Sequence, residues 1–352
     1  MKKLLSCMLS LAILFSMFIP AFASEPQEVV TERIVEQSGY SFTISERVDE
    51  NGTIIRSYEN DGSLTYSSSV PDIEKTKAVL IALGMQEKNV EMLNSDALDA
   101  FSTGEEIMLS TSYSKIDSDN NVTYLPEEQA LAESSALRAK QQDALLALSQ
   151  GIMTMADYDD YDDYEENAYM RVDYAVAYKG DGQYFYSTDA NWLTMPSIRY
   201  MDSVGSCAME GTVTPETQYG YYWYTSQHFS MGVMEEEPVF EYLEDNYDND
   251  KDGNWYGSAG YFNLPRNTGT GNNGTVHQDF GAHFQYRGHV TSPDERRFFN
   301  TVGSYTHATV TIAASPSITI SYPGGLSASA GIAAVGAKDV IGVEFEVEYI
   351  PD

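Results

Sequence analysis

The sequence predicts an α+β N-terminal part over residues 24–150, followed by an all-β antiparallel sandwich of jelly-roll-like type over residues 168–352. Helix-favouring segments rich in Ala, Leu, Glu and Gln are confined to the first part. Short runs in which apolar and polar residues alternate dominate the second part. Between them, DYDDYDDYEE at residues 157–166 is nearly all carboxylate and tyrosine. Because crowded like charges resist burial, we expect residues 151–167 to be a solvated linker; a docking strip for a cationic or Ca2+-bridged partner is the alternative.

The first 23 residues have the three parts of a secretory signal peptide. Lys2 and Lys3 form a positive start, an apolar run follows, and Ala21-Phe22-Ala23 supplies a small-residue cleavage site. We therefore expect residues 1–23 to be removed and the mature chain to be secreted to the extracellular space. The apolar run is too short to span a membrane and no second run of spanning length follows, so no membrane insertion is expected after cleavage.

Strand and turn signals open the N-terminal part. Residues 40–45 alternate between apolar and polar, and the pairs NG at 51–52 and DG at 61–62 suit tight hairpin turns. A three-stranded meander is therefore expected over residues 40–45, 53–58 and 63–66. Residues 24–38 show little periodicity, and we expect a loose lead-in there.

Helix signals follow the meander. Pro71 suits a first helical turn and Gly84 a helix end, and Pro126 and Gly151 bracket the longest candidate in the same way. The predicted helices span residues 71–84, 94–104 and 126–150, and the predicted strands among them span residues 107–116 and 122–124.

The C-terminal part has a period of two. Alternation is clearest at residues 170–178, 280–286, 318–322 and 343–349, with Gly- or Pro-containing turns between strands. In the last of these runs, one face is apolar and the other carries Glu344, Glu346 and Glu348. One side of this strand must therefore face water, as in an antiparallel sandwich.

Charge and cysteine content limit the partners. The formal charge is -33, and losing Lys2 and Lys3 with the signal peptide makes it -35. A chain this acidic repels nucleic acid, so no nucleic-acid partner is expected, whereas divalent cations or a cationic partner fit. Cys207 is the only cysteine of the mature chain, so no intramolecular disulfide can form. We expect Cys207 to be a small buried hydrophobe and not a catalytic thiol.

The run DNDKDG at residues 248–253 is the best candidate for a metal site. Oxygen atoms on alternate residues, followed by a glycine that permits a sharp turn, can surround Ca2+. Ala259 occupies the position where an EF-hand has its bidentate glutamate, so the run is not an EF-hand. A solvated turn without metal is the alternative. The ligands expected for Ca2+ are Asp248, Asp250, Asp252 and Asn254.

Aromatic residues cluster in two places and are the candidates for ligand contact. On a strand, Tyr222 and Tyr224 point to one face, while Tyr221 and Trp223 point to the other. One set can be core and the other exposed, and exposed rings stack on sugars or other rings. Packing of both sets inside the protein is the alternative. The candidate ligand-binding residues are Tyr221, Trp223, Trp255 and Tyr256.

Other motifs lack the context that their chemistry needs. The string G-x-G-x-x-G at residues 269–274 lies in a polar loop and not between a strand and a helix. His277, His283 and His289 would share a face of one strand, but successive histidines would be about 20 Å apart at 3.3 Å per residue, too far to share a zinc ion. No nucleophile elbow and no H-E-x-x-H is present.

These observations predict a secreted, non-enzymatic binding or surface-associated protein with a carbohydrate or protein ligand, in which Ca2+ is the one candidate cofactor. A secreted hydrolase acting on polysaccharide or cell wall is the first alternative. A toxin or bacteriocin-like effector, suggested by the Gly- and Ala-rich residues 324–337, is the second.

Overall fold

The computed structural model describes residues 30–67, 70–117, 121–158, 167–196, 199, 201–208, 211–230, 233–243, 247–249, 257–290, 297–308, 318–321, 329–332 and 337–349. Residues 1–30 and residues 31–352 form separate units, and every element described below lies in the second. Antiparallel β structure predominates in this unit and helices are few. No helix in the described ranges is both long enough and apolar enough to cross a membrane.

The larger of two main sheets crosses the predicted domain boundary. Along its main path the strands are β1 (Thr31–Gln37), β2 (Tyr40–Val48), β3 (Ile54–Glu59), β6 (Glu106–Asp117), β8 (Asn167–Tyr178), β9 (Gln183–Thr194), β17 (Asn273–Val290), β12 (Tyr219–Ser230) and β13 (Val233–Tyr242). Three further strands pair at its sides: β7 (Val122–Leu125) with β6, and β11 (Gly211–Val213) and β16 (Thr268–Thr270) with β17. Because β6 and β8 pair along their whole lengths, the regions before and after residues 151–167 share one sheet and are not two separate domains.

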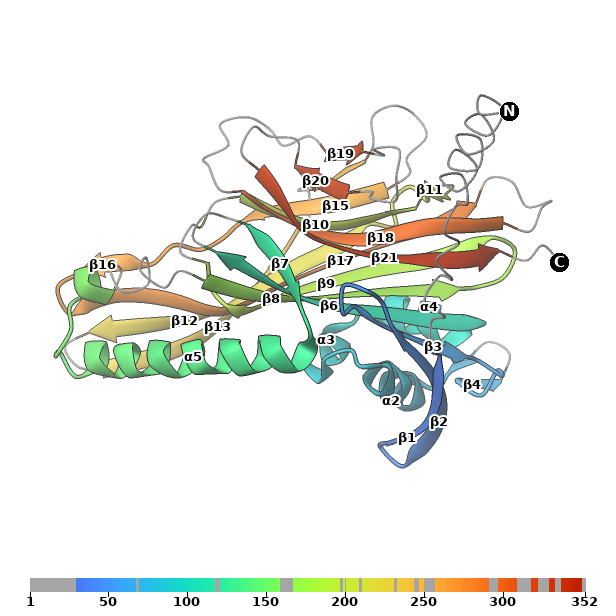
Figure 1. Ribbon diagram of the computed structural model, residues 1–352, viewed down its shortest axis with the longest axis horizontal. Helices are drawn as coiled ribbons and strands as arrows, with labels where there is room; N and C mark the ends of the chain where they lie inside the picture. The colour runs from blue at the N-terminus through green and yellow to red at the C-terminus, as the bar shows by residue number, and fades with distance from the viewer. Residues whose placement is uncertain are drawn as a thin grey trace, which may run out of the picture. The chain divides into compact units, whose positions relative to one another are not determined.

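The smaller sheet packs against one face of the larger one, as Figure 1 shows within the unit of residues 31–352. Its strands, in pairing order, are β14 (Tyr247–Asn249), β15 (Gly257–Asn263), β10 (Met201–Ala208), β18 (Arg297–Ala308) and β21 (Ala337–Tyr349). The core between the sheets includes Tyr186 and Phe284 from the larger sheet, and Phe262 and Tyr305 from the smaller one. Two short hairpins complete the described β structure: β4 (Thr65–Ser67) with β5 (Val70–Pro71), and β19 (Ile318–Ser321) with β20 (Ser329–Ile332).

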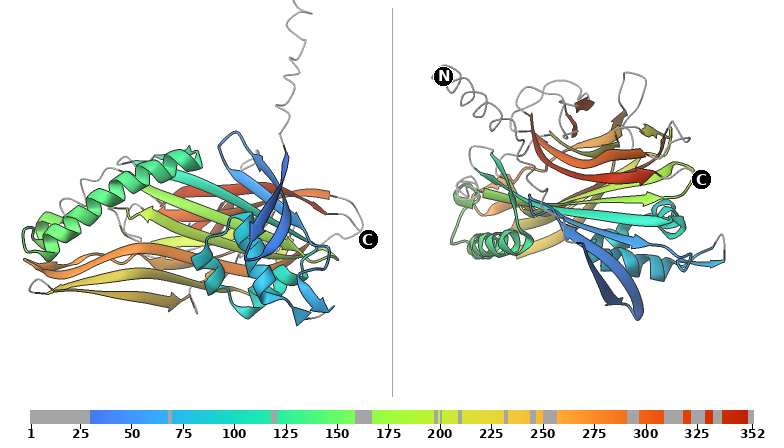
Figure 2. Two further views of the ribbon diagram at one scale, coloured as in Figure 1. Left: turned by 90° about the horizontal axis from the view of Figure 1, so that it is seen from below. Right: turned by 45° about the vertical axis from the view of Figure 1, so that its right-hand side comes forward.

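Helices cover the opposite face of the larger sheet (Figure 2). They are α2 (Ile73–Leu83), α3 (Glu87–Met92), α4 (Ser95–Thr103) and α5 (Glu127–Ser149). Ile107 and Leu109 of β6 pack with helical residues, whereas Met108 packs with the smaller sheet. Because alternate strand residues point to opposite faces, the helices and the smaller sheet lie on opposite sides.

Local signals explain where the helices begin and end. The Asp72 side chain accepts a hydrogen bond from the Lys75 backbone N–H at the start of α2, and Asn94 caps α4 through the Ala97 N–H. Gly84 ends α2 in the left-handed conformation, at φ 106°.

Most predicted element positions agree with the structure, with three differences. Helices α2, α4 and α5 lie within the ranges predicted to be helical, which are residues 71–84, 94–104 and 126–150. The predicted third strand of the meander, at residues 63–66, does not join the second strand: β4 pairs with β5, and β6 takes the place beside β3. The prediction of a loose lead-in is wrong for the described end of that segment, because β1 pairs with β2 there. The short helix α3 was not expected, because it has no side-chain cap and is only 6 residues long.

Candidate functional site

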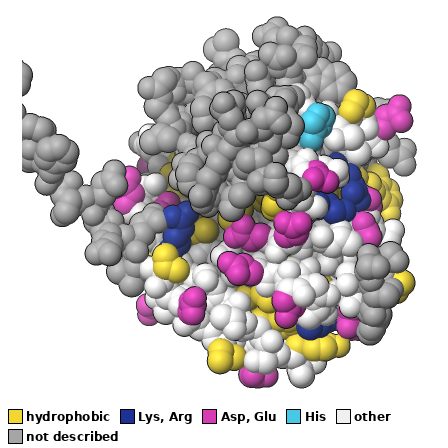
Figure 3. Space-filling view, turned by 90° about the vertical axis from the view of Figure 1, so that its right-hand side faces the viewer, with side chains coloured by type: hydrophobic (Ala, Val, Ile, Leu, Met, Phe, Trp, Pro, Cys, Tyr) yellow, Lys and Arg dark blue, Asp and Glu magenta, His cyan; other side chains and the backbone are white. Residues whose placement is uncertain are grey.

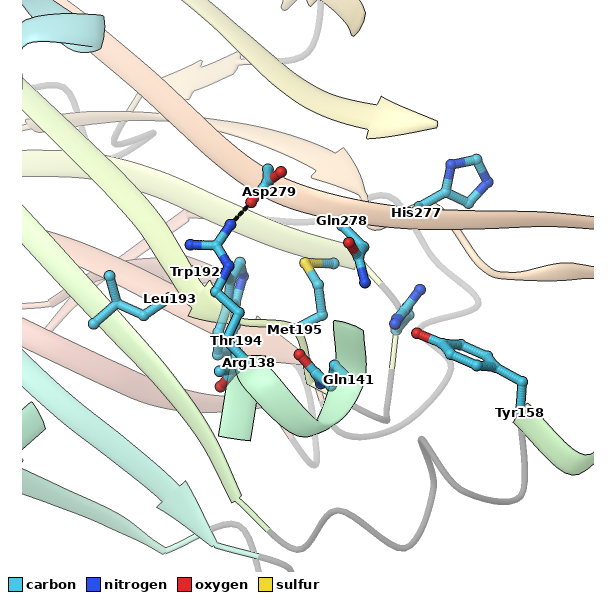
Figure 4. Close-up of a pocket in the computed structure, with 11 residues that line it drawn as sticks. Arg138, Gln141, Tyr158, Trp192, Leu193, Thr194, Met195, His277, Gln278 and Asp279 are labelled. Atoms are coloured by element: carbon cyan, nitrogen blue, oxygen red, sulfur yellow. Dashed lines mark ion pairs between the residues drawn. The ribbon is translucent and has the colours of Figure 1, made fainter. Parts of the chain in front are cut away.

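A small pocket lies beneath α5, against the end of β9 and the middle of β17 (Figure 4). Its volume is about 20 Å³. A space of this size holds one or two water molecules and is too small for a sugar ring. The lining residues are Arg138, Gln141, Tyr158, Trp192, Leu193, Thr194, Met195, Arg199, His277, Gln278 and Asp279.

A β-bulge directs a carboxylate into this pocket. The register between β12 and β17 shifts between Trp223 and Thr225, and Asp279 of β17 has φ 52°. Aspartate tolerates this left-handed backbone better than most residues. The side chain of Asp279 forms an ion pair with Arg138 of α5, which Figure 4 marks with a dashed line. The bulge therefore turns a strand residue towards the helix above it.

Arg199 brings a second guanidinium to the pocket. The residue is buried, its Nε donates to the Pro196 carbonyl at 3.1 Å, and its Nη1 donates to Asn267 Oδ1 at 2.7 Å. Burial, together with the charges of Arg199 and His228, lowers the pKa of His277 to about 4. His277 is therefore neutral at pH 7.

A buried histidine–aspartate pair lies on the helix-covered face of the sheet. The Ala97 N–H and the Gln285 Nε2 both donate to Asn94 Oδ1, at 2.8 and 3.3 Å. Gln285 therefore presents Oε1 to His283, whose Nε2 lies 2.9 Å away and must donate. His283 Nδ1 lies 2.9 Å from Asp189 Oδ1, so both ring nitrogens lie within hydrogen-bond distance of a buried oxygen.

The neighbouring strand β8 continues this buried polar row. Arg171 Nε donates to both carboxylate oxygens of Asp173, at 3.0 and 2.9 Å, and Thr111 donates to Oδ1 at 2.7 Å. Burial raises the pKa of Asp173, and Arg171 opposes that shift. In the described part of the chain, three buried polar residues of β9 have side-chain atoms without a hydrogen-bond partner: Ser187, Asp189 and Asn191. Buried waters are the usual partners of such atoms.

A second pair lies between the two sheets. His307 Nδ1 lies 2.9 Å from Asp202 Oδ1, and Tyr305 donates to Asp202 Oδ2. Trp192 Nε1 in turn donates to the Tyr305 hydroxyl at 3.0 Å. Asp202 and His307 are 0% and 2% exposed. Neither this pair nor the pair formed by Asp189 and His283 is exposed to solvent. Both are therefore buried polar interactions of the protein interior and are not accessible to a ligand.

An exposed acidic feature of the described residues is the edge strand β13. Of its 10 residues, all are exposed except the half-buried Val239. It pairs with β12 and, among the strands that the structure describes, with no other. Four glutamates lie on it: Glu235, Glu236, Glu237 and Glu241. On the face drawn in Figure 3, by contrast, acidic side chains are spread among uncharged side chains, Lys and Arg.

The expected aromatic platform is not exposed. Tyr221 and Trp223 do share a face, as predicted, but they are 0% and 4% exposed. Tyr221 stacks on His283 with ring centroids 4.7 Å apart, and Lys88 Nζ of α3 lies 5.2 Å from the Trp223 ring. The prediction of exposed rings at these two positions is therefore wrong, because α3 covers them. Tyr222 and Tyr224, on the other face, pack against the core between the sheets.

Most of the other predicted site residues lie outside the described residues, namely Asp250, Asp252, Asn254, Trp255 and Tyr256. Asp248 lies on β14, where only the backbone is described. Within the described part of the chain, no group of three or more His, Cys, Asp or Glu is arranged to hold a metal ion. The Ca2+ loop therefore stays a prediction.

The three histidines of β17 do not share one face. His277 contacts the Tyr224 ring and lies 3.0 Å from the Ser226 hydroxyl, whereas His283 stacks on Tyr221, which points the opposite way. The bulge at Asp279 reverses the alternation between them.

Sequence reasoning missed the pairing of Arg138 with Asp279 and the approach of Arg199. The one local signal is the polar triplet at residues 277–279, which interrupts the apolar alternation of β17. Comparison with protein-family models gave no match, and no curated protein matches the sequence significantly.

Proposed function

We propose that the chain is a secreted, non-enzymatic binding protein that pairs with a cationic, extended segment of a protein partner along the β13 edge. The observation that carries this proposal is a 10-residue edge strand, which pairs with β12 alone among the described strands and has nine exposed residues and four glutamates. Edge strands bind extended peptides by adding a strand to the sheet, through main-chain hydrogen bonds. Exposed Met234, Phe240 and Tyr242 supply apolar contacts on one face of the added strand.

Charge selects the partner. The edge strand of a sheet can pair with a strand of another chain, and the glutamates on β13 disfavour pairing with an acidic strand. The opposite free edge, β1, carries Glu32 and Glu36, so pairing β13 with β1 of a second copy would bring like charges together. A segment rich in Lys or Arg meets no such repulsion, and the net charge of -33 attracts it from a distance.

The remaining parts of the proposal concern export, fold type and metal. Residues 1–23 are proposed to direct secretion, and the packing of the two sheets supports a sandwich-like fold. Ca2+ at residues 248–254 is proposed as a stabilising ion only. A carbohydrate ligand is the alternative within the binding class.

The rival function, a hydrolase acting on polysaccharide or cell wall, needs two carboxylates facing each other across the substrate. In the pocket beneath α5, the only lining carboxylate is that of Asp279, and it is paired with Arg138. The edge strand therefore supports binding better than this pocket supports hydrolysis.

Fluorescence anisotropy with a labelled peptide tests the proposal. A peptide as long as β13 that alternates Lys and Val should bind, and a peptide of equal charge with Pro in place of Val should not, because proline cannot donate to the ladder. Replacing Glu235, Glu236 and Glu237 with Gln should weaken binding roughly tenfold, at about 0.5 kcal/mol for each exposed ion pair.

A matched variant controls for net charge. Glu32→Gln, Glu36→Gln and Glu50→Gln remove the same charge from exposed positions away from β13. This variant should bind like the wild type. Equal weakening of both variants, or equal binding of both peptides, would mean diffuse charge attraction and would refute strand pairing at β13.

A further inference from the structure

We infer that the segment which pairs with β13 is an amphipathic strand, with Lys or Arg side chains on one face and apolar or aromatic side chains on the other. The inference rests on the proposed function, because it assumes that a partner adds a strand at this edge. Successive residues of a strand point to opposite faces of the sheet. The exposed side chains of β13 therefore form two rows beside the added strand, and the two rows differ in chemistry.

One row, called the acidic row below, lies on the same face as the core between the two sheets. Tyr222 and Tyr224 of β12 pack against that core, and they are the register partners of Glu241 and Val239. Residues directly opposite each other on neighbouring strands share a face, so the acidic row lies on this side. Its members are Val233, Glu235, Glu237, Val239 and Glu241.

The charges of the acidic row have no cationic side chain of the described residues to balance them, apart from a histidine. Glu237 Oε2 lies 3.6 Å from His228 Nε2, and the Tyr222 hydroxyl donates to Glu241. No lysine or arginine within the described ranges forms an ion pair with these two glutamates or with Glu235. Glu235 and Glu237 repel each other across about 7 Å, and basic side chains in the facing row of an added strand would offset that repulsion.

The other row, called the apolar row below, lies on the helix-covered face. Its members are Met234, Glu236, Pro238, Phe240 and Tyr242. Met234, Phe240 and Tyr242 are 49%, 42% and 54% exposed. The Phe240 ring lies 4.8 Å from the buried Tyr221 ring and 5.1 Å from the Tyr242 ring, measured between centroids. Apolar or aromatic side chains in the facing row of an added strand would bury the exposed surface of these rings.

Glu236 is the one charged member of the apolar row, and it already has a polar partner. Its Oε2 accepts a hydrogen bond from Gln227 Nε2 of β12 at 3.4 Å. The inference therefore assigns the attraction of basic side chains mainly to Glu235, Glu237 and Glu241.

Two peptides of one composition test the inference by fluorescence anisotropy. One is as long as β13 and alternates Lys and Val, and the other has the same residues as one block of Lys and one block of Val. Their charges are equal, but only the alternating peptide places every Lys on one face. It should bind roughly tenfold more tightly, and equal affinities would overturn the inference. If neither peptide binds, the proposed function itself fails, so the two failures are distinguishable.

Glu236 and Glu237 give a matched pair of variants. They are neighbours in the chain, both are exposed, and they lie on opposite faces of β13. Glu236→Lys and Glu237→Lys change the net charge equally. Glu237→Lys should weaken the alternating peptide roughly tenfold, because it opposes the Lys row of the peptide, and Glu236→Lys by no more than about threefold. Equal weakening by both variants would show that the two faces are not distinguished.

A double-mutant cycle tests the apolar row. Phe240→Ala is combined with a peptide in which Ser replaces every Val. Phe240→Ala should weaken the Lys–Val peptide about threefold to tenfold and leave the affinity for the Lys–Ser peptide unchanged, because only Val buries the ring. Phe240 is exposed, and thermal unfolding of the variant checks that it folds like the wild type. Equal weakening of both peptides would refute contact between the apolar row and the partner.

Discussion

Replacing Gly281 with alanine would place a methyl group against the indole of Trp223. An added Cβ would lie 2.8 Å from Trp223 Cη2 and closer still to Cζ2 and Cε2. Carbon atoms prefer about 3.5–4.0 Å, so the ring would have to withdraw by about 1 Å. Trp223 cannot withdraw freely, because Lys88 Nζ lies 5.2 Å from its ring and the Tyr221 ring centroid lies 5.8 Å away. Gly281 is not among the described glycines with positive φ, so the effect is steric.

Overpacking of a buried site costs about 1–3 kcal/mol, and we expect Gly281→Ala to lower the free energy of unfolding by about 2–3 kcal/mol. Urea unfolding measures this loss as a lower midpoint at an unchanged slope. In a Trp223→Leu background the new methyl group finds space, so the coupling energy should be about 1–2 kcal/mol. Equal cost of Gly281→Ala in both backgrounds would show that the ring does not lie on this glycine.

Three further predictions concern single sites. Cys207 is 0% exposed, so a thiol reagent should label it only in denaturant; fast labelling of the native protein would contradict its burial. Burial lowers the pKa of His277 from 6.5 to about 4. Between these two pH values His277 is mainly protonated in the unfolded chain and mainly neutral in the folded chain. The free energy of unfolding should therefore fall by about 1–2 kcal/mol as the pH falls from 6.5 to 4, where the figure allows for the partial exposure of His277. In His277→Gln this decrease should be absent. Millimolar Ca2+ should raise Tm more than Mg2+ does at equal ionic strength, and Asp250→Asn should abolish the difference; equal effects in both proteins leave only screening.

Local periodicity predicted elements better than it predicted their partners. Alternation at residues 170–178 and 280–286 gave the position of β8 and part of β17, since period two is a property of neighbouring residues. Which strands pair is decided by contacts far apart in the chain. The acidic run therefore looked like a boundary between domains, although the strands on either side of it, β6 and β8, are direct neighbours in the sheet.

The candidate site depended on features that a single sequence does not display. Sequence alternation predicted that Tyr221 and Trp223 share a face. Their burial depends on α3, which was not predicted because it has no side-chain N-cap. The meeting of Arg138 with Asp279 depends on a bulge and on the docking of α5. The β13 glutamates were visible in the sequence, but that their strand forms an edge was not.

The order of the strands in the larger sheet has a consequence during synthesis. Strand β9 lies in the middle of the finished sheet, but its partner β17 comes much later in the chain; 94 residues separate Asp189 from His283. A growing chain thus presents β9 as a temporary edge, at which a nascent neighbour could pair. Until His283 arrives, the Asp189 carboxylate lies in the middle of that edge and opposes any apolar strand from another molecule. In the finished sheet the same carboxylate is buried and lies 2.9 Å from His283 Nδ1.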